Sequence, residues 1–191
     1  MIHDLILKNR SYRRFDQSVN IALADLESLV ELARLSSSSR NLHPLKYVLS
    51  NKVERNKEIF PALSWAGYFK EWPGPVEGER PSAYIIMLGD TKIAPAFSVD
   101  PGIAAQSILL GATEKGYGGC IIGTINAEKL EKFLKTPSHL EIIYVIALGK
   151  PVEVVQIEDL PESGDVKYWR DENKVHHVPK RSLKDIIVNL D

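Results

Sequence analysis

The sequence predicts one domain, spanning 1–191, of the α+β or α/β class, in which helices cover a single β-sheet. Its 191 residues are 44% apolar and 26% charged, which suits one globular domain with its own core. Stretches with strand character interleave with helical patterns in an irregular order. The run AYIIMLGD (83–90) is apolar without interruption, which is typical of a strand covered on both faces. Together these features favour a layered sandwich.

The first half of the chain predicts one clear helix and one short strand. Leu26, Leu29, Val30 and Ala33 follow the i, i+3, i+4, i+7 spacing of an amphipathic helix within 21–35. The serines 36–39 end it, and the apolar, β-branched residues 46–51 predict a strand. Residues 52–70 favour a helix interrupted by a proline, and 72–81, rich in proline and glycine, predict a surface loop.

The second half predicts a buried helix between strands. Asp100 and Pro101 suit the N-cap and first turn of a helix that runs to about Lys115. That helix is apolar nearly all round, so we expect it to be buried on several sides, with a subunit interface as one place for it. Strands are expected at 120–124 and 142–148, with a helix at 127–134 between them.

Composition excludes several classes of function. A net charge of -1 provides no field for a polyanion, so no nucleic-acid partner is expected. No run approaches the roughly 20 apolar residues of a membrane helix, and the charged N-terminus does not suit a signal peptide. We therefore expect a cytoplasmic protein with no membrane partner. The one cysteine, Cys120, lies in an apolar run and is more often a core residue than a nucleophile.

Known catalytic motifs are also lacking from the sequence. The adjacent His176 and His177 cannot form a helical i, i+4 metal clamp, so no metal site is expected. The chain has no G-x-S-x-G, P-loop or G-x-G-x-x-G pattern, which disfavours nucleophilic hydrolysis and a Rossmann dinucleotide site.

Two basic segments lie near the two ends of the chain. RSYRRF begins at Arg10, and PKRSL places Lys180 and Arg181 before a short closing helix. Each segment alone is more often solvated surface. If the ends meet in space, however, their arginine and lysine side chains form a pocket that suits one phosphate.

Two further segments are compatible with a flat ligand. In GYGGCIIGT, a helix end and a tight turn account for Gly116 and Gly118, but Gly123 weakens a strand unless its backbone must approach something closely. SSSSRNLHP (36–44) offers hydroxyls, an amide and backbone N–H groups suited to the edge of a heteroaromatic ring. A plain helix ending explains that segment equally well.

Six segments follow one another in a characteristic order along nearly the whole chain: RSYRRF, SSSSRNLHPLKY, DPGIAAQSILLGA, GYGGCIIG, ALGKP and PKRSL. In them the chain resembles the nitroreductase family of FMN-dependent oxidoreductases. The resemblance implies an α+β three-layer sandwich, with a central, mostly antiparallel sheet flanked by helices, in an intertwined homodimer with FMN at its interface. The chain differs from the family at three positions: the family commonly has proline where Ser37 stands, glutamine where His43 stands and tryptophan where Leu45 stands.

The resemblance also implies a set of FMN-binding residues. Arg10, Ser11 and Arg13 match contacts to the phosphate and ribityl chain, and Lys180 and Arg181 match C-terminal phosphate contacts. Ser37, Ser38, Ser39 and Asn41 match a loop that reaches the flavin from the other subunit. Ile122 and Gly123 match the segment whose backbone faces flavin N5 and O4.

The activity implied is transfer of electrons from NADH or NADPH, through flavin N5, to a nitroaromatic, a quinone or a similar small acceptor. The cofactor supplies the chemistry, so no catalytic acid or base is expected among the side chains. Two alternatives stay open: a relative on the same fold that fragments flavin or removes halogen reductively, and a non-catalytic FMN-binding or sensing protein.

Overall fold

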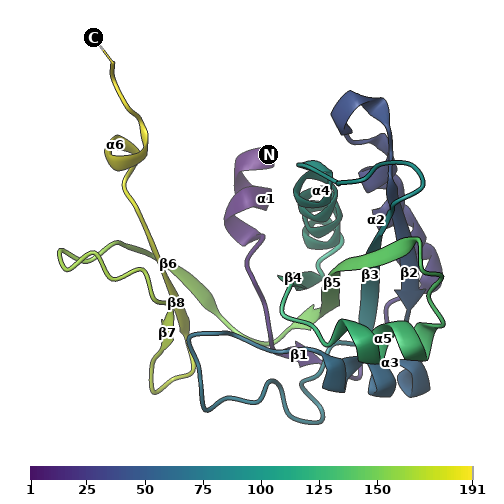
Figure 1. The fold of residues 1–191 in the computed structure, drawn as a ribbon. Coiled ribbons are helices and arrows are strands. Elements are labelled where there is room, and N and C mark those ends of the chain that lie inside the picture. Colours follow the sequence, from purple (N-terminus) through teal and green to yellow (C-terminus); the bar gives the residue numbers. More distant parts are fainter. Residues whose placement is uncertain (191) are drawn as a thin grey trace.

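The main body of the protein is an antiparallel sheet, shown in a computed structural model that describes residues 1–190 (Figure 1). The strands are β1 (Phe15–Asp16), β2 (Leu45–Ser50), β3 (Ala83–Asp90), β4 (Gly118–Ile122) and β5 (Leu140–Pro151). Their order is β1-β5-β3-β2, and β4 also pairs with β5. Every pair in this sheet is antiparallel.

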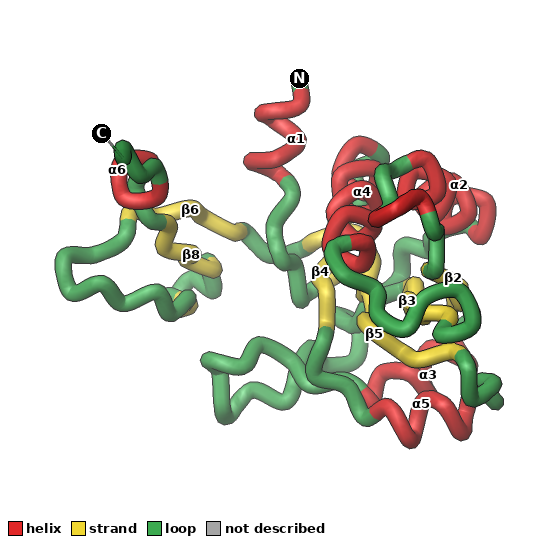
Figure 2. Tube along the Cα trace, turned by 45° about the horizontal axis from the view of Figure 1, so that its top comes forward, coloured by secondary structure: helices red, strands yellow, loops and turns green. Residues whose placement is uncertain are grey.

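Helices cover both faces of the sheet. On one face lie α2 (Leu23–Leu35) and α4 (Asp100–Glu114), and on the other lie α3 (Val53–Ile59) and α5 (Ala127–Leu134), as Figures 1 and 2 show. Two short 3-10 helices, η1 (Ser39–Asn41) and η2 (Phe60–Ala62), lie at the ends of the helical layers. The arrangement is the three-layer α+β sandwich that the resemblance implied.

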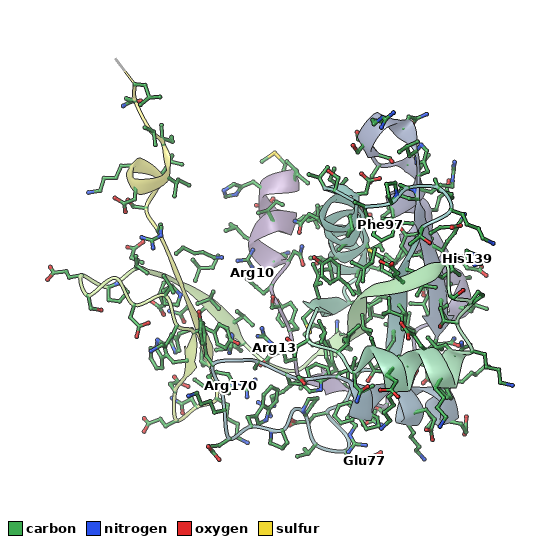
Figure 3. All side chains as sticks on the ribbon, in the orientation of Figure 1. Arg10, Arg13, Glu77, Phe97, His139 and Arg170 are labelled. Carbon is green, nitrogen blue, oxygen red and sulfur yellow. The ribbon has the colours of Figure 1, made fainter. Side chains whose placement is uncertain are left out.

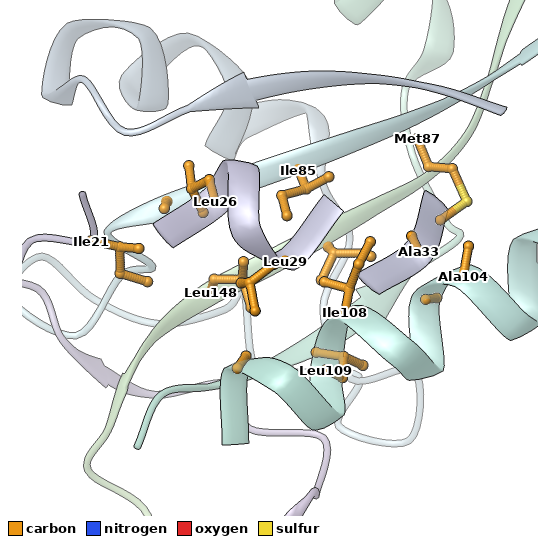
Figure 4. Packing of buried hydrophobic residues seen from close by; sticks show 14 residues of the cluster. Ile21, Leu26, Leu29, Ala33, Ile85, Met87, Ala104, Ile108, Leu109 and Leu148 are labelled. Carbon is orange, nitrogen blue, oxygen red and sulfur yellow. The ribbon is translucent and has the colours of Figure 1, made fainter. Parts of the chain in front are cut away.

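The central strand β3 divides the core in two. Ile85 and Met87 pack with Leu29 of α2 and Ile108 of α4 in one cluster (Figure 4). The alternate residues of the strand, Tyr84, Ile86 and Leu88, pack with Ile59 and Leu130 in the second cluster. All eight residues of β3 are buried, so the expectation of a strand covered on both faces is confirmed.

After β5 the chain leaves the main body as a C-terminal arm, residues 152–190 (Figure 1). It contains β6 (Val155–Asp159), β7 (Trp169–Arg170) and β8 (His176–Lys180), which form a small sheet in the order β6-β8-β7. The short helix α6 (Leu183–Ile186) follows. At the other end of the chain, α1 (Ile2–Lys8) stands beside the body. No helix among residues 1–190 combines the length and the apolar character needed to cross a membrane.

Several predicted boundaries agree with the structure. The strand at 83–90 and the helix at 127–134 are found at those residues, and the side chain of Asn126 caps the latter by accepting from the Lys129 N–H. The helix expected over 52–70 is wrong beyond Ile59. Pro61 allows only a 3-10 turn, after which Leu63 forms a bridge with Ile125.

The buried helix was predicted with one error. Asp100 is its first residue and Val99 occupies the N-cap, while the Asp100 carboxylate accepts from Ser38 and Ser39. The helix is buried on several sides, as expected, and Gly102 and Gln106 are exposed in the single chain. The sequence patterns did not indicate α1, β1 or the small sheet of the arm.

Candidate functional site

A cavity of about 250 Å³ lies between the N-terminal segment and the C-terminal arm. Four of the predicted FMN-binding residues line it: Arg10, Ser11, Arg13 and Lys180. Figure 3 shows Arg10 and Arg13 on the segment that passes the arm. The other lining residues are Asn9, Val155, Tyr168, His176 and Val178. The two basic segments therefore meet in space, and we call this space the cationic cavity.

One buried carboxylate fixes the N-terminal segment against the arm. Glu153, only 7% exposed, accepts hydrogen bonds from the backbone N–H groups of Arg13 and Arg14. Its other oxygen accepts from Nη2 of Arg170 at 3.1 Å. A buried carboxylate is tolerated when such donors surround it. This contact orients Arg13 toward the cavity.

The three arginines of RSYRRF have different roles. Arg14 forms a two-pronged ion pair with Glu79, with Nε–Oε2 at 2.7 Å and Nη2–Oε1 at 2.5 Å. This hydrogen bonding lowers the pKa of the Glu79 carboxyl. Arg14 therefore binds the surface loop through Glu79, and only Arg10 and Arg13 of the three arginines line the cationic cavity.

A second cavity, of about 150 Å³, adjoins the first along the outer edge of β4. It lies between 64–67 and 120–124, and Ile122 and Gly123 line it as predicted. Arg13 and Tyr168 line both cavities, and the Arg13 guanidinium lies 5.0 Å from the centre of the Tyr168 ring. We call this second space the ring cavity.

Glycine is required at some positions near the ring cavity and not at others. Gly116 has a φ of +78, which suits the turn after α4, and a Cβ at Gly119 would lie 2.3 Å from the Ala147 carbonyl oxygen. A Cβ at Gly123 would meet only the Tyr144 ring, at an ordinary 3.5 Å. The chain's own packing does not require glycine there. The close approach of a ligand to Gly123 stays a prediction.

Cys120 also lines the ring cavity but is not reactive. Its side chain is buried, and this burial raises the pKa of the thiol to about 12. The thiolate that nucleophilic chemistry needs is therefore scarce at neutral pH.

The serine loop is anchored on the first residue of α4. The Ser38 hydroxyl donates to Oδ2 of Asp100 at 2.5 Å, and the Ser39 N–H donates to Oδ1 at 2.8 Å. Ser38 Oγ also accepts from the N–H of His43 at 2.9 Å, so its one donor hydrogen and one of its two lone pairs are used within the chain. Oδ1 of Asn41 contacts Nε2 of His43 at 2.7 Å. The asparagine and histidine thus build a turn with three positive φ angles, at Arg40, Asn41 and His43.

Within one chain this loop lies away from the other predicted residues. Ser37 and Ser38 line a separate cavity of about 510 Å³, together with Tyr47 and Asp100, that has no residue in common with the cationic and ring cavities. Ser39 and Asn41 lie in η1 next to it. Arg181 follows β8 and is not among the residues that line the cationic cavity.

The sequence patterns did not indicate Glu153, Tyr168, Arg170 and His176 of the arm, where PKRSL is the one motif, nor Trp65 of the ring cavity. Arg170 lies 4.4 Å from the ring of Trp72 and 5.0 Å from that of Phe69, which ties the arm to the 63–80 loop (Figure 3). Among residues 1–190, no three His, Cys, Asp or Glu side chains are grouped so that they could hold a metal ion.

Comparison with known proteins identifies the fold. The model of the Nitroreductase family matches residues 6–150. The chain belongs to the nitroreductase family. It is similar to an FMN reductase (NADPH) of Bacillus subtilis, with 24% identity over 79% of this chain and 66% of that protein. It is equally similar to an iodotyrosine deiodinase of Thermotoga neapolitana, with 25% identity over 79% of this chain and 89% of that protein.

A solved structure supports the same assignment. An FMN-dependent nitroreductase of Clostridium difficile R20291 superimposes with a TM-score of 0.66 at 22% identity, over 92% of this chain and 98% of that one. This likeness concerns the fold alone. The family resemblance drawn from six weak motifs is therefore confirmed, whereas the individual site residues are not tested by it.

Proposed function

We propose that the protein is an FMN-dependent oxidoreductase that passes electrons from NADH or NADPH to a small acceptor such as a nitroaromatic or a quinone. The observation that carries this proposal is the pair of adjoining cavities, which share Arg13 and Tyr168. One is lined by cations and the other runs along a strand edge at Gly123. A ligand with a phosphate at one end and a flat ring system at the other would match both.

The residues present fit FMN. Arg10, Arg13 and Lys180 supply positive charge for one terminal phosphate, and charge-assisted contacts of this kind are strong. Three residues that line the cavities also hold buried polar atoms without a partner among residues 1–190: Nε of Arg10 and both ring nitrogens of His176 at the cationic cavity, and Nε1 of Trp65 at the ring cavity. Buried polar groups of this kind normally have a partner, which a ligand could supply.

In this proposal the chain binds and orients, and the cofactor reacts. Bound FMN would accept hydride from the nicotinamide and pass electrons to the acceptor. Arg10, Ser11, Arg13 and Lys180 hold the phosphate end, with Arg181 as a further candidate after β8. The backbone at Ile122 and Gly123, which lines the ring cavity, would hold the ring, and a preorganised N–H there would stabilise negative charge. Cys120 stays protonated, and no side chain is assigned as an acid or base.

We also propose that the working unit is a homodimer. Ile2, Ile6 and Leu7 of α1 are exposed, as are Leu183, Ile186, Ile187 and Val188 in the last part of the arm. Exposed apolar segments of this kind are typical of surfaces covered by a partner. A second copy would bring the serine loop, with Ser37, Ser38, Ser39 and Asn41, to the flavin of its partner, which would account for the distance of this loop from the two cavities in its own chain.

Two alternatives use the same site. The iodotyrosine deiodinase relative is as similar as the FMN reductase, which keeps reductive dehalogenation open as a second chemistry. A non-catalytic FMN-binding protein would keep the cavities but would not accept electrons from a nicotinamide.

Anaerobic reduction separates these proposals. We expect the purified protein to be yellow and to release FMN, not FAD, on denaturation. NADH or NADPH should bleach the flavin absorbance without oxygen, and a nitroaromatic or quinone should restore it. Flavin that is bound but not bleached indicates the binding protein, and restoration only by a halogenated phenol indicates the dehalogenase. A colourless chain that takes up no FMN would contradict all three.

A further inference from the structure

A histidine of the C-terminal arm is buried without a partner. His176 is only 1% exposed, yet neither Nδ1 nor Nε2 has a hydrogen-bond partner among residues 1–190. Polar groups buried in this way are rare, because each loses its contacts with water and gains nothing in return. The ring therefore points to a partner from outside the chain.

The strand directs this ring into the cationic cavity. Successive residues of a strand face opposite sides, and His176, Val178 and Lys180 of β8 all line the cavity. Val155, the register partner of His176 on β6, lines it too. His177 faces the other way, and its Nδ1 contacts Glu158 at 2.6 Å.

Positive charge surrounds His176. Burial, together with the charges of Arg13 and Arg170, lowers the pKa of its ring to about 4. Its other close neighbours are two aromatic rings, Phe69 at 5.6 Å edge-on and Tyr168 at 5.1 Å between ring centres. The further charged or titratable groups near it are Arg10, Lys180, Glu153 and His177.

A phosphate in this cavity would offset the positive charge around His176. It offers oxygen acceptors to the unpartnered ring and negative charge against the two arginines. The carboxylate of Glu153 does not do this, because its oxygens accept from Arg13, Arg14 and Arg170 and neither ring nitrogen of His176 has a partner among residues 1–190.

We propose that His176 is a further phosphate ligand of this site, donating a ring N–H to a phosphate oxygen, and that the phosphate binds together with one proton taken up by this ring. The inference rests on the proposed function, since the phosphate is that of FMN. It makes FMN binding depend on pH. The complex holds one more proton than its separated components, so affinity falls as pH rises, by up to about tenfold per unit, until the proton is lost from the complex.

The test compares two flavins on three proteins. FMN and riboflavin, which lacks the phosphate, are titrated into flavin-free wild type, His176→Gln and His177→Gln at pH 6.5 and 8.0. Free phosphate monoesters are mostly dianionic in this range, because their second pKa is about 6. His177→Gln is the matched control, because this neighbour faces away from the cavity.

For wild type we expect FMN to bind at least about threefold more tightly at pH 6.5 than at pH 8.0. His176→Gln should weaken FMN binding about tenfold at pH 6.5 and remove the pH dependence, since it loses a charge-assisted contact. Riboflavin binding should be the same in wild type and His176→Gln. His177→Gln should behave like wild type with both flavins.

Two results would overturn the inference while leaving the proposed function intact: FMN binding by His176→Gln with wild-type affinity and pH dependence, or an equal loss of riboflavin binding. Failure of wild type to bind FMN would instead overturn the proposed function and, with it, the ligand assumed here. If His176→Gln does not fold, NMR titration of the histidine rings in wild type decides. We expect the pKa of one ring, near 4 in the free chain, to rise by about three units with FMN, and an unchanged value refutes the inference.

Discussion

Replacing Gly123 by alanine adds one methyl group to the wall of the ring cavity and tests whether a ligand lies against this backbone. The new Cβ would meet only Tyr144, at 3.5 Å and 3.6 Å, which are ordinary contact distances. The φ of Gly123 is not positive, so alanine adopts this conformation without strain. The free energy of unfolding of the flavin-free chain should therefore change by less than about 0.5 kcal/mol.

Flavin binding should respond differently. A methyl group forced into a packed contact typically costs about 1–3 kcal/mol, so FMN affinity should fall roughly 5- to 150-fold. Gly119→Ala is the matched control in the same strand. Its Cβ would lie 2.3 Å from the Ala147 carbonyl oxygen and 2.8 Å from Leu148, so this variant should lose stability in the absence of any flavin.

Urea unfolding of the flavin-free variants and flavin fluorescence titration measure the two quantities separately. Unchanged FMN affinity in a stable Gly123→Ala variant would show that no ring approaches this backbone, and would remove the ring cavity from the proposed site.

Three further predictions concern the ends of the chain and the serine loop. Arg13→Ala and Lys180→Ala should each weaken FMN binding about ten- to hundredfold, by loss of a charge-assisted contact, and the double variant should lose less than the sum. Fluorescence titration should show a smaller loss for Arg181→Ala, because this residue does not line the cationic cavity. Asp100→Asn should lower the free energy of unfolding in urea by about 1–3 kcal/mol, because the Ser38 hydroxyl and the Ser39 N–H lose a charged acceptor. The flavin-free chain should lose stability as pH falls from 6.5 to 4, because burial holds the pKa of His176 at about 4 and the unfolded chain takes up the proton first. In urea titrations across this range, His176→Gln should remove up to about 3 kcal/mol of that dependence.

The main body was largely predictable because its elements carry strong local signals. The run at 83–90 has no polar residue before its last, which is typical of a strand covered on both faces, and its bounds are those of β3. The helix at 127–134 begins at an asparagine that caps it. Residues 63–70 are the counterexample. Their apolar side chains suggested a helix, but Leu63 pairs with Ile125 and Trp65 packs under Gly74, contacts that no local pattern indicates.

The site was predictable only where a residue belongs to a motif. Arg10, Ser11, Arg13 and Lys180 could be named from two segments, and the structure brings them together although about 170 positions separate them in the sequence. What holds them together could not be named, because a carboxylate in the sequence gives no sign of its partners. Glu153 follows ALGKPV without any distinguishing pattern, yet it bonds the backbone of Arg13 and the side chain of Arg170 at once.

The same buried carboxylate gives the arm a role in the site. If Glu153 sets the position of Arg13, then removing its charge should move the cationic cavity as well as weaken the arm's attachment. Arg170, which loses its carboxylate in such a variant, still stacks on Trp72 and Phe69, so the arm keeps an aromatic anchor. Glu153 therefore contributes both to the position of Arg13 and to the attachment of the arm, whereas the aromatic contacts of Arg170 contribute to the attachment alone. The arm thus contributes a wall, through His176 and Lys180, to a cavity whose other basic residues, Arg10 and Arg13, lie near the opposite end of the chain.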